Sequence, residues 1–355
     1  MIDSSEGKQE IERRDMQRFS KWLSTSKRNE RGETYKKYYQ RFPVGKYTEL
    51  EIFAERRFDK AELGYSVSLP KFRYDNNVQM LLPNDLEETA EGIGNLVEHY
   101  SGIPFDTLNA RQSRTDFVYN FLMSQDEVNR RISVSKLVRS SGQDARIIDK
   151  EKGLPSIYFG RKGYRELYLY SKMEETVLRI KQRKAGDDHL QGSIGILRME
   201  DAHYAPKLKQ DAERLGLKHI TLAALLDSRI AEEILRNDME QLLLDKPIAG
   251  RDERREKLKE HCGQDTAKYA RLIGFLDEVN EIGEKEAIKF FGYDYARRAR
   301  IELTQAGLWL AKENRIPLPA LIAPTFENFV IDEATVCGVR SNTSHKLAPV
   351  QTLAH

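Results

Sequence analysis

The chain has 355 residues, of which 39% are hydrophobic and 32% are charged. This length allows two or three domains, and the hydrophobic content excludes a chain that is disordered throughout. The 58 Lys and Arg residues nearly cancel the 56 Asp and Glu residues, which leaves a formal net charge of +2. The overall charge therefore identifies no partner.

Membrane proteins and disulfide-rich proteins are excluded as classes. No window approaches the roughly 18 consecutive apolar residues that a membrane helix needs, and the first residues lack the apolar run of a signal peptide. The two cysteines, Cys262 and Cys337, are too few for a disulfide framework and lack the spacing of a zinc site. We therefore expect a cytosolic protein that binds no membrane.

Residues 1–60 are polar, with apolar residues such as Ile11, Phe19 and Trp22 at helical intervals. This spacing predicts a helix, and the Tyr-rich sequence that follows it predicts a loosely organised stretch. We therefore assign 1–60 to a polar N-terminal arm or helix.

The segment 61–205 has the pattern of a sheet with helices. Leu63, Tyr65 and Val67 alternate with small or polar residues, which predicts a half-buried strand that ends near Pro70. A helix is predicted after Asn84, where a capping-box spacing precedes an apolar stripe.

Further strands and one helix follow in this segment. Strands are predicted at 113–121 and 194–202, a hairpin at 155–170, and a helix at 126–138. This order predicts an α+β fold in which a mixed or antiparallel sheet carries helices on one face.

The pattern becomes almost wholly helical after about residue 206. Apolar residues recur at spacings of three and four, and helices are predicted at 222–244, 252–262, 265–281, 284–291 and 293–314. We therefore expect an all-helical C-terminal domain over 206–332 and a flexible tail over 333–355.

Charge is uneven along the chain. Residues 130–185 hold 15 Lys or Arg and 6 Asp or Glu, a local excess of +9. A basic strip beside a sheet is typical of a protein that binds a polyanion. An ordinary solvated surface is the other interpretation, and charge alone does not separate the two.

Two tyrosines and a lysine lie close together in the predicted hairpin. Tyr168, Tyr170 and Lys172 would share one face of a strand, because side chains alternate along it. A phenol beside an ammonium group could act as a nucleophile, although its pKa of about 10 requires a nearby cation or metal to favour the phenolate. Tyrosines are also ordinary strand residues, so the spacing leaves both interpretations open.

Two carboxylates occupy the middle of predicted strands. Asp116 and Glu200 are poorly suited to such positions unless they face a polar site. Together they indicate a site for a hard divalent cation such as Mg²⁺ or Mn²⁺. The alternative is two ordinary ion pairs, Asp116 with Arg114 and Glu200 with Arg198.

Several common site motifs are missing from the sequence. We find no Gly-x-Gly-x-x-Gly, no Walker A sequence, no Gly-x-Ser-x-Gly and no His-hydrophobe-His pair. Dinucleotide binding, ATP binding in the usual loop, the usual hydrolase elbow and a histidine-paired nicking site are therefore not expected. DNA, RNA or protein remain as partners.

Several short motifs then occur in a distinctive order. They are Ser68-Leu69-Pro70-Lys71-Phe72 with Asn76-Asn77-Val78, Ser113-Arg114-Thr115-Asp116, Tyr158-Phe159-Gly160 with Leu169-Tyr170-Ser171-Lys172, and Leu197-Arg198-Met199-Glu200. In this order they resemble the replication initiators of filamentous phages, the gene II family, and related plasmid and prophage initiators. Residues 270–299 resemble the helical C-terminal half of that family, so the resemblance covers roughly 62–315.

The resemblance implies a rolling-circle replication initiator. Such a protein nicks one strand of origin DNA, holds the 5′ phosphate on a tyrosine, leaves a 3′ hydroxyl and later rejoins the strand. It implies a ferredoxin-like, nicking-endonuclease domain over 61–205, acting in the cytoplasm of a bacterial host. The implied partners are origin DNA, both duplex and single-stranded, the host replicative helicase and a second copy of the chain.

The family motif also assigns roles to single residues. It implies Tyr170 as the nucleophile, with Tyr168 as its rival, and Lys172 as the group that stabilises developing charge. The metal ligands would be Asp116, Glu200 and, as a weaker candidate, Glu175. DNA contacts are expected from the basic residues Lys71, Arg114, Arg161, Lys162, Arg165 and Arg198.

The chain departs from the family at two places. Family members often begin with a hydrophobic strand, whereas this chain opens with charged residues, and the turn at Asp75-Asn76-Asn77 lacks the usual glycine. Two other functions also fit the sequence. One is a plasmid mobilisation relaxase with the same chemistry, and the other is a catalytically silent DNA-binding regulator of replication.

Overall fold

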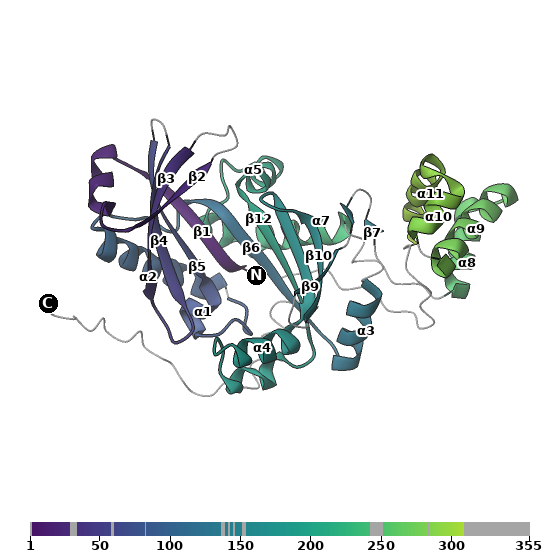
Figure 1. The fold of residues 1–355 in the computed structure, drawn as a ribbon, viewed down its shortest axis with the longest axis horizontal. Helices are drawn as coiled ribbons and strands as arrows, with labels where there is room; N and C mark the ends of the chain where they lie inside the picture. Colours follow the sequence, from purple (N-terminus) through teal and green to yellow (C-terminus); the bar gives the residue numbers. More distant parts are fainter. Residues whose placement is uncertain are drawn as a thin grey trace.

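In the computed structural model, the chain folds into one wide antiparallel sheet with helices packed against it and a further group of helices from later in the sequence, drawn in green at the right of Figure 1. Helices and strands together confirm the predicted α+β class. The residues that the structure describes are 2–28, 34–57, 60–81, 83–135, 139–140, 143–144, 146–150, 154–241, 251–282 and 284–308. The predicted flexible tail over 333–355 lies outside them.

Ten strands form the sheet, and each pairs antiparallel with its neighbours. In spatial order they are β2 (Leu23–Arg28), β3 (Thr34–Pro43), β4 (Glu49–Arg57), β5 (Lys60–Ser68), β1 (Ile2–Ile11), β6 (Arg111–Leu122), β12 (Ile196–Tyr204), β11 (Arg165–Ser171), β10 (Leu154–Arg161) and β9 (Arg146–Lys150). Two short strands, β7 (Arg139–Ser140) and β8 (Gln143–Asp144), pair separately.

The assignment of 1–60 to a polar arm or helix is wrong. This segment supplies four strands and a short 3₁₀ helix, and β1 lies in the middle of the sheet between β5 and β6. Long-range pairing decides this outcome, because the polar sequence of β1 is hydrogen-bonded to a strand on each side. The predicted strands at 62–69, 113–121 and 194–202 and the hairpin at 155–170 correspond to β5, β6, β12 and β10–β11.

The two faces of the sheet differ in character. Successive side chains of a strand point to opposite faces, so each strand contributes to both. Phe117, Met199 and Leu169 lie on the face that joins the hydrophobic core. Asp116 and Glu200, each one position away from these apolar neighbours, lie on the other face, which is polar. The polar face is the one that carries the predicted site.

Helices cover the apolar face. Buried residues of α2 and α7 join those of the central strands in one hydrophobic cluster, which also includes Val128 and Ile132 of α3. The elements packed around the sheet are η1 (Arg13–Phe19), α1 (Leu69–Tyr74), α2 (Pro83–Ser101), α3 (Gln125–Ser135), α4 (Lys172–Lys181), η2 (Asp187–His189), η3 (Gln191–Ser193), α5 (Ala205–Arg214), α6 (Leu222–Leu225) and α7 (Ser228–Gln241). The predicted helices after Asn84 and at 126–138 correspond to α2 and α3.

Two helices begin directly where strands end and so position the site. Helix α1 starts after β5 with Pro70 in its first turn, where the missing N–H of proline costs no hydrogen bond. Helix α4 starts after β11, and the Ser171 hydroxyl caps it by accepting the Glu174 N–H. Both helices lie at the same end of the sheet, below β1 and β12 in Figure 1.

The C-terminal helices have a core of their own. Phe275 is fully buried at the centre of a second hydrophobic cluster that shares no residue with the first. These helices are α8 (Arg251–Cys262), α9 (Thr266–Ile282), α10 (Glu284–Phe291) and α11 (Tyr293–Gln305). They match the helices predicted at 252–262, 265–281, 284–291 and 293–314, except that α11 ends at 305 and 309–314 lie outside the described residues. The helix predicted at 222–244 is instead the pair α6 and α7, whose buried residues belong to the core of the sheet. In the part of the chain that the structure describes, no helix is both long enough and apolar enough to cross a membrane.

The finer prediction of a ferredoxin-like core is not confirmed. A ferredoxin-like fold contains a split β-α-β unit, in which a third strand lies between the two strands joined by the helix. Here β12 lies directly beside β6, and β11, β10 and β9 follow in order as an antiparallel meander. The fold is therefore a large antiparallel sheet with helices packed against it.

Candidate functional site

Four of the residues predicted from sequence lie together on the polar face. In the register of the sheet, Tyr170 pairs with Arg198, Tyr168 pairs with Glu200, and Ala202 pairs with Asp116. Paired residues point to the same face, so the two tyrosines and the two carboxylates share it. Sequence alternation correctly placed the tyrosines on one face.

The Tyr170 hydroxyl contacts Glu200 directly. It donates a hydrogen bond to Glu200 Oε2 at 2.8 Å, and Tyr170 is 8% exposed. Burial, and after it the Glu200 carboxylate, raise the pKa of the Tyr170 hydroxyl well above its usual range. The group is therefore a phenol whose proton already points at a carboxylate that can accept it.

Asp116 is buried against an arginine. Arg114 Nε and Nη2 donate to its two carboxylate oxygens at 2.7 and 2.8 Å, so the first of the two alternative ion pairs forms. Burial nevertheless raises the pKa of Asp116 to about 7, with Arg114 opposing the shift and Glu200 adding to it. Asp116 and Glu200 are therefore close enough to repel each other electrostatically.

Lys172 does not belong to the strand, contrary to prediction, but is the first residue of α4. It is fully buried, and its Nζ donates to Asn77 Oδ1 at 2.9 Å and to Glu175 Oε2 at 2.7 Å. Burial and then Arg198 lower the pKa of Lys172 well below its usual range. The residue is thus held rigidly beneath the site.

The suggestion of Glu175 as a third metal ligand is not supported. Its carboxylate forms ion pairs with Lys172 and with Arg179, both on α4. These helical neighbours at spacings of three and four occupy both of its oxygens. The carboxylate therefore stabilises α4 and does not join Asp116 and Glu200.

Arg198 occupies the floor of the site and is only 1% exposed. Its Nε donates to Asn120 Oδ1 at 2.8 Å and its Nη2 to the Val78 carbonyl at 3.1 Å, while Nη1 lies 3.9 Å from Asp3 Oδ2. The predicted role in contacting DNA directly is therefore corrected. Arg198 is a buried support that joins β12, β6 and β1.

Asp3 is a third carboxylate of the site, and sequence reasoning missed it. A bulge in the pairing of β1 with β6 lies between Ile2 and Ser4, so Asp3 is the extra residue. It is 4% exposed and accepts a hydrogen bond from the Ser68 hydroxyl at 3.0 Å. Burial raises its pKa, but Arg198 and the other nearby cations outweigh burial and hold it below the usual range.

The remaining predicted DNA contacts differ in accessibility. Arg161 and Lys162 are exposed at the turn between β10 and β11, and Arg114 is partly exposed. Lys71 on α1 is half-buried, and burial followed by the Arg179 charge lowers its pKa to about 8. Part of the predicted basic strip over 130–185 lies outside the described residues.

Arg165 is on the opposite face of the sheet, so its predicted DNA contact is wrong. It is 3% exposed and makes a bidentate pair with Asp201 at 2.8 and 3.1 Å. The Arg165 Nη1 also lies 3.3 Å from Asp238 Oδ1. Register explains the error, because Arg165 is an odd number of positions from Tyr168 and Tyr170 and so points away from them.

Beside Arg165 lies a group that could hold a metal ion. Asp201, His203 and Asp238 are all buried, and their ligand atoms lie within 4.8 Å of one another. Among the residues that the structure describes, this is the one group of three or more His, Cys, Asp or Glu side chains with such spacing. The expected set of Asp116, Glu200 and Glu175 does not form a comparable group.

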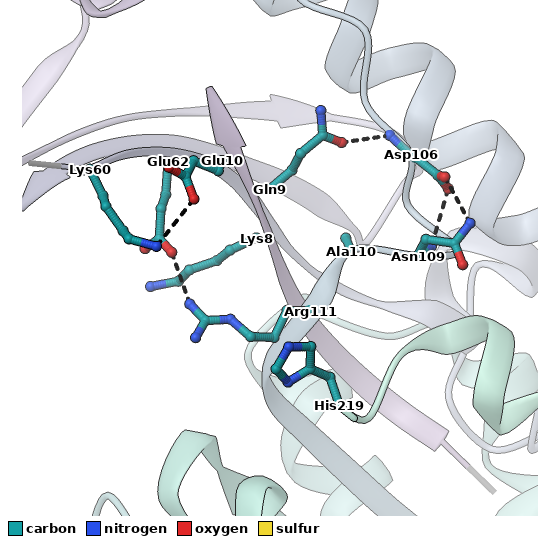
Figure 2. Close-up of a pocket in the computed structure, with 10 residues that line it drawn as sticks. All are labelled: Lys8, Gln9, Glu10, Lys60, Glu62, Asp106, Asn109, Ala110, Arg111 and His219. Atoms are coloured by element: carbon teal, nitrogen blue, oxygen red, sulfur yellow. Dashed lines mark hydrogen bonds and ion pairs between the residues drawn. The ribbon is translucent and has the colours of Figure 1, made fainter. Parts of the chain in front are cut away.

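An open pocket of about 850 Å³ lies near the other end of the central strands (Figure 2). Its charged side chains pair with one another, for example Lys60 Nζ with Glu10 Oε2 at 3.3 Å and Arg111 Nη2 with Glu62 Oε1 at 2.8 Å. The lining residues are Lys8, Gln9, Glu10, Lys60, Glu62, Asp106, Asn109, Ala110, Arg111 and His219. It includes none of the residues predicted for catalysis or metal binding.

Comparison with known proteins adds no neighbour to this description. No family model, no curated protein and no solved structure matches the chain. The sequence motifs and the geometry of the polar face are therefore the features that point to a function.

Proposed function

We propose that the protein is a rolling-circle replication initiator that nicks and rejoins one strand of origin DNA through a covalent 5′-phosphotyrosine. The observation that carries the proposal is the hydrogen bond from the Tyr170 hydroxyl to Glu200, on a polar face shared with Asp116. A nucleophile with a base in hydrogen-bond reach is the minimum requirement for this chemistry.

The transfer step is a substitution at phosphorus. The Tyr170 oxygen attacks the scissile phosphodiester, the new oxygen–phosphorus bond forms, and the phenolic proton passes to Glu200. The bond from phosphorus to the 3′ oxygen breaks, and that oxygen leaves with the electron pair and takes up a proton. Because a phosphotyrosine ester replaces the phosphodiester, the reverse reaction reseals the strand without ATP.

Positive charge beside the site supports the developing negative charge. Lys172 is buried at the start of the ten-residue helix α4, where burial and Arg198 disfavour its charged form, so Arg198 is the fixed cation. Arg198 pairs with Tyr170 across the strands and is two positions from Glu200 on the same face of β12. Fixed positive charge in a buried site stabilises a transition state more strongly than the same charge in water.

The carboxylates are suited to a hard divalent cation. Asp3, Asp116 and Glu200 lie close enough for the first and third to raise the pKa of the second, and such repulsion is relieved by an Mg²⁺ or Mn²⁺ ion on their oxygens. Among the described residues these three carboxylates do not have the spacing of a formed metal site, so an ion would have to draw their oxygens together. When bound, the ion would polarise the scissile phosphate.

DNA would lie along the polar face, with sequence-independent contacts from Lys71, Arg114, Arg161 and Lys162. Such phosphate contacts position a strand without specifying its sequence, and they weaken steeply as salt is added. The helical domain carries two exposed aromatic residues, Phe290 at 73% and Tyr293 at 69%. They offer a surface for the helicase or the second copy that the resemblance implies in the host cytoplasm.

A catalytically silent DNA-binding regulator is the second candidate. The low exposure of Tyr170 and the bidentate pairing of Asp116 with Arg114 are the observations that favour it. Both features must rearrange when a phosphate enters the site. A mobilisation relaxase would share the site chemistry and differ only in the DNA product, a transferred strand in place of a replicated circle.

The test is formation of a covalent adduct. The full chain is incubated with Mn²⁺ and a library of single-stranded oligonucleotides, and adducts that survive denaturation are counted. We expect Tyr170→Phe to abolish the adduct and to leave DNA affinity unchanged, and Tyr168→Phe to retain the adduct. If only Tyr168→Phe abolished the adduct, Tyr168 and not Tyr170 would be the nucleophile. If the unmodified chain formed no adduct, the catalytically silent regulator would be the remaining function.

A further inference from the structure

A second polar centre lies on the back of the sheet, away from Tyr170. Asp201 and His203 come from β12, and Asp238 comes from α7, which packs over that face. All three side chains are 0% exposed. Charged and polar groups are this deeply buried only when they are paired or bind an ion.

Two atoms of this centre, His203 Nε2 and Asp238 Oδ2, face each other and find partners only within the centre. They lie 2.9 Å apart, and His203 Nε2 lies 3.4 Å from Asp201 Oδ1. Ligands held about 2.0–2.2 Å from one ion are separated by about 2.9–3.5 Å in tetrahedral or octahedral geometry. Two of the separations among these three ligand atoms therefore match a coordination shell, and all three atoms lie within 4.8 Å of one another.

The other ring nitrogen of His203 is held by a carboxylate. His203 Nδ1 lies 2.7 Å from Asp211 Oδ2 on α5, and Lys207 of the same helix forms an ion pair with Asp211. A hydrogen on Nδ1 leaves the lone pair of Nε2 directed at the two aspartates. Metal-binding histidines are oriented in this way by a carboxylate behind them.

The charges of the centre require one more cation. Asp201, Asp211 and Asp238 carry three negative charges, whereas Arg165 and Lys207 supply two positive charges. With a neutral His203, one buried negative charge is left without compensation. A proton on His203 brings the sum to zero, and a divalent ion in its place brings it to +1.

We infer that Asp201, His203 and Asp238 bind one divalent transition-metal ion of the zinc type, which fastens α7 to β12. The imidazole nitrogen favours Zn²⁺ over Mg²⁺, which prefers oxygen ligands alone. Because the three side chains are fully enclosed, the ion has a structural role and is separate from the carboxylates of the polar face. This inference does not depend on the proposed function.

The test measures Zn²⁺ in the full chain by equilibrium dialysis and mass spectrometry of metals. We expect one tightly held Zn²⁺ per chain that excess Mg²⁺ does not displace, and a melting temperature that falls when a strong chelator removes it. His203→Gln and Asp238→Asn should lose the ion. Asp211→Asn keeps all three ligands and should weaken binding about 10- to 100-fold.

Asp116→Asn is the matched control, because it alters the polar face and should leave the Zn²⁺ in place. The inference would be overturned if the chain held almost no Zn²⁺ and a chelator left its melting temperature unchanged. The missing positive charge would then be a proton on His203. An ion that Asp116→Asn removes and Asp238→Asn retains would overturn it as well. The Zn²⁺ content and the effect of the chelator on the melting temperature are both measured on the wild-type chain, so misfolding of a variant does not obscure the result.

Discussion

We propose two roles for Glu200 at the polar face. It accepts the Tyr170 proton, and it is a ligand for a cation. Its Oε2 accepts the phenolic hydrogen bond at 2.8 Å, so the acceptor role requires no movement of either side chain. A neutral amide of the same shape keeps the hydrogen bond but cannot take the proton. The residue can therefore be tested without removing volume from the site.

We expect Glu200→Gln to lower the rate of DNA cleavage by about 10²- to 10⁴-fold, the usual contribution of a general base, and to leave DNA affinity unchanged. Single-turnover cleavage and equilibrium binding measure the two effects. Glu166→Gln is the matched control. Glu166 lies on the same strand face as Tyr168, and its partner Ala202 is the next residue after Glu200 on that face of β12. Cleavage within threefold of the wild-type rate in Glu200→Gln would exclude Glu200 as the base.

Lys71 gives DNA binding a pH dependence. Burial, then Arg179, lower its pKa to about 8, while Asp3 raises it. Since a phosphate favours the charged amine, binding draws a proton onto Lys71 above pH 8, and the affinity should fall about fivefold between pH 8 and pH 9. Titrations with a fluorescent oligonucleotide measure this dependence.

Lys71→Arg should remove that pH dependence, because arginine stays charged over this range. Lys162→Arg, the same substitution on the exposed hairpin turn, should leave it in place. An affinity that falls equally with pH in wild type and in Lys71→Arg would show that Lys71 does not contact the phosphates.

Strands β5 and β1 approach each other so closely that a glycine is required. A Cβ on Gly64 would lie 2.6 Å from Phe53 Cζ and 2.7 Å from the Gly7 carbonyl oxygen. Gly274 in α9 is different, because a Cβ there meets nothing within 4 Å. These two positions separate a glycine that the packing needs from one that the helix merely tolerates.

We expect Gly64→Ala to lower the free energy of unfolding of the sheet by about 1–3 kcal/mol through overpacking. Gly274→Ala should instead stabilise the helical domain by up to about 1 kcal/mol, because alanine is the better helix former. Urea denaturation followed by circular dichroism measures both. If Gly64→Ala left the free energy of unfolding unchanged, Phe53 and the neighbouring strand would have to move aside at no cost.

Elements with a regular apolar period could be predicted from sequence, and those without one could not. β5 alternates Leu63, Tyr65 and Val67, and the period identified it. β1 has apolar residues only at its two ends, and its buried Ser5 is satisfied by Tyr65 and Gln112 from neighbouring strands. Such cross-strand polar pairing leaves no local signal.

The candidate site divides in the same way. Tyr170, Glu200 and Asp116 could be grouped because each stands out within its own strand. Asp3 could not, since its role depends on a bulge in a strand that local pattern reads as an arm. The back centre joins His203 to Asp238 across 35 positions of chain, and no short motif spans that distance.

At the scale of the whole molecule, two hydrophobic cores define two units of stability. The sheet and its helices share one cluster, and α8 to α11 share the other. Leu169 and Phe275 are each fully buried, one in each cluster. Separate cores allow the two units to unfold at different temperatures.

We expect differential scanning calorimetry to show two transitions. Phe275→Ala should lower the stability of the helical unit alone by about 3–5 kcal/mol, and Leu169→Ala that of the sheet unit alone by about 2–5 kcal/mol. One transition that both variants shift equally would mean that the two units unfold together.

The central position of β1 has a consequence for biosynthesis. Ser4 pairs on one side with Ser68 and on the other with Asp116, so β1 is synthesised long before its second neighbour, β6. Until β6 has emerged, the nascent chain exposes unpaired strand edges, which favour aggregation and demand chaperone protection. Such distant pairing also slows folding. Recovery of folded material should therefore respond more to the speed of translation than to the composition of the buffer.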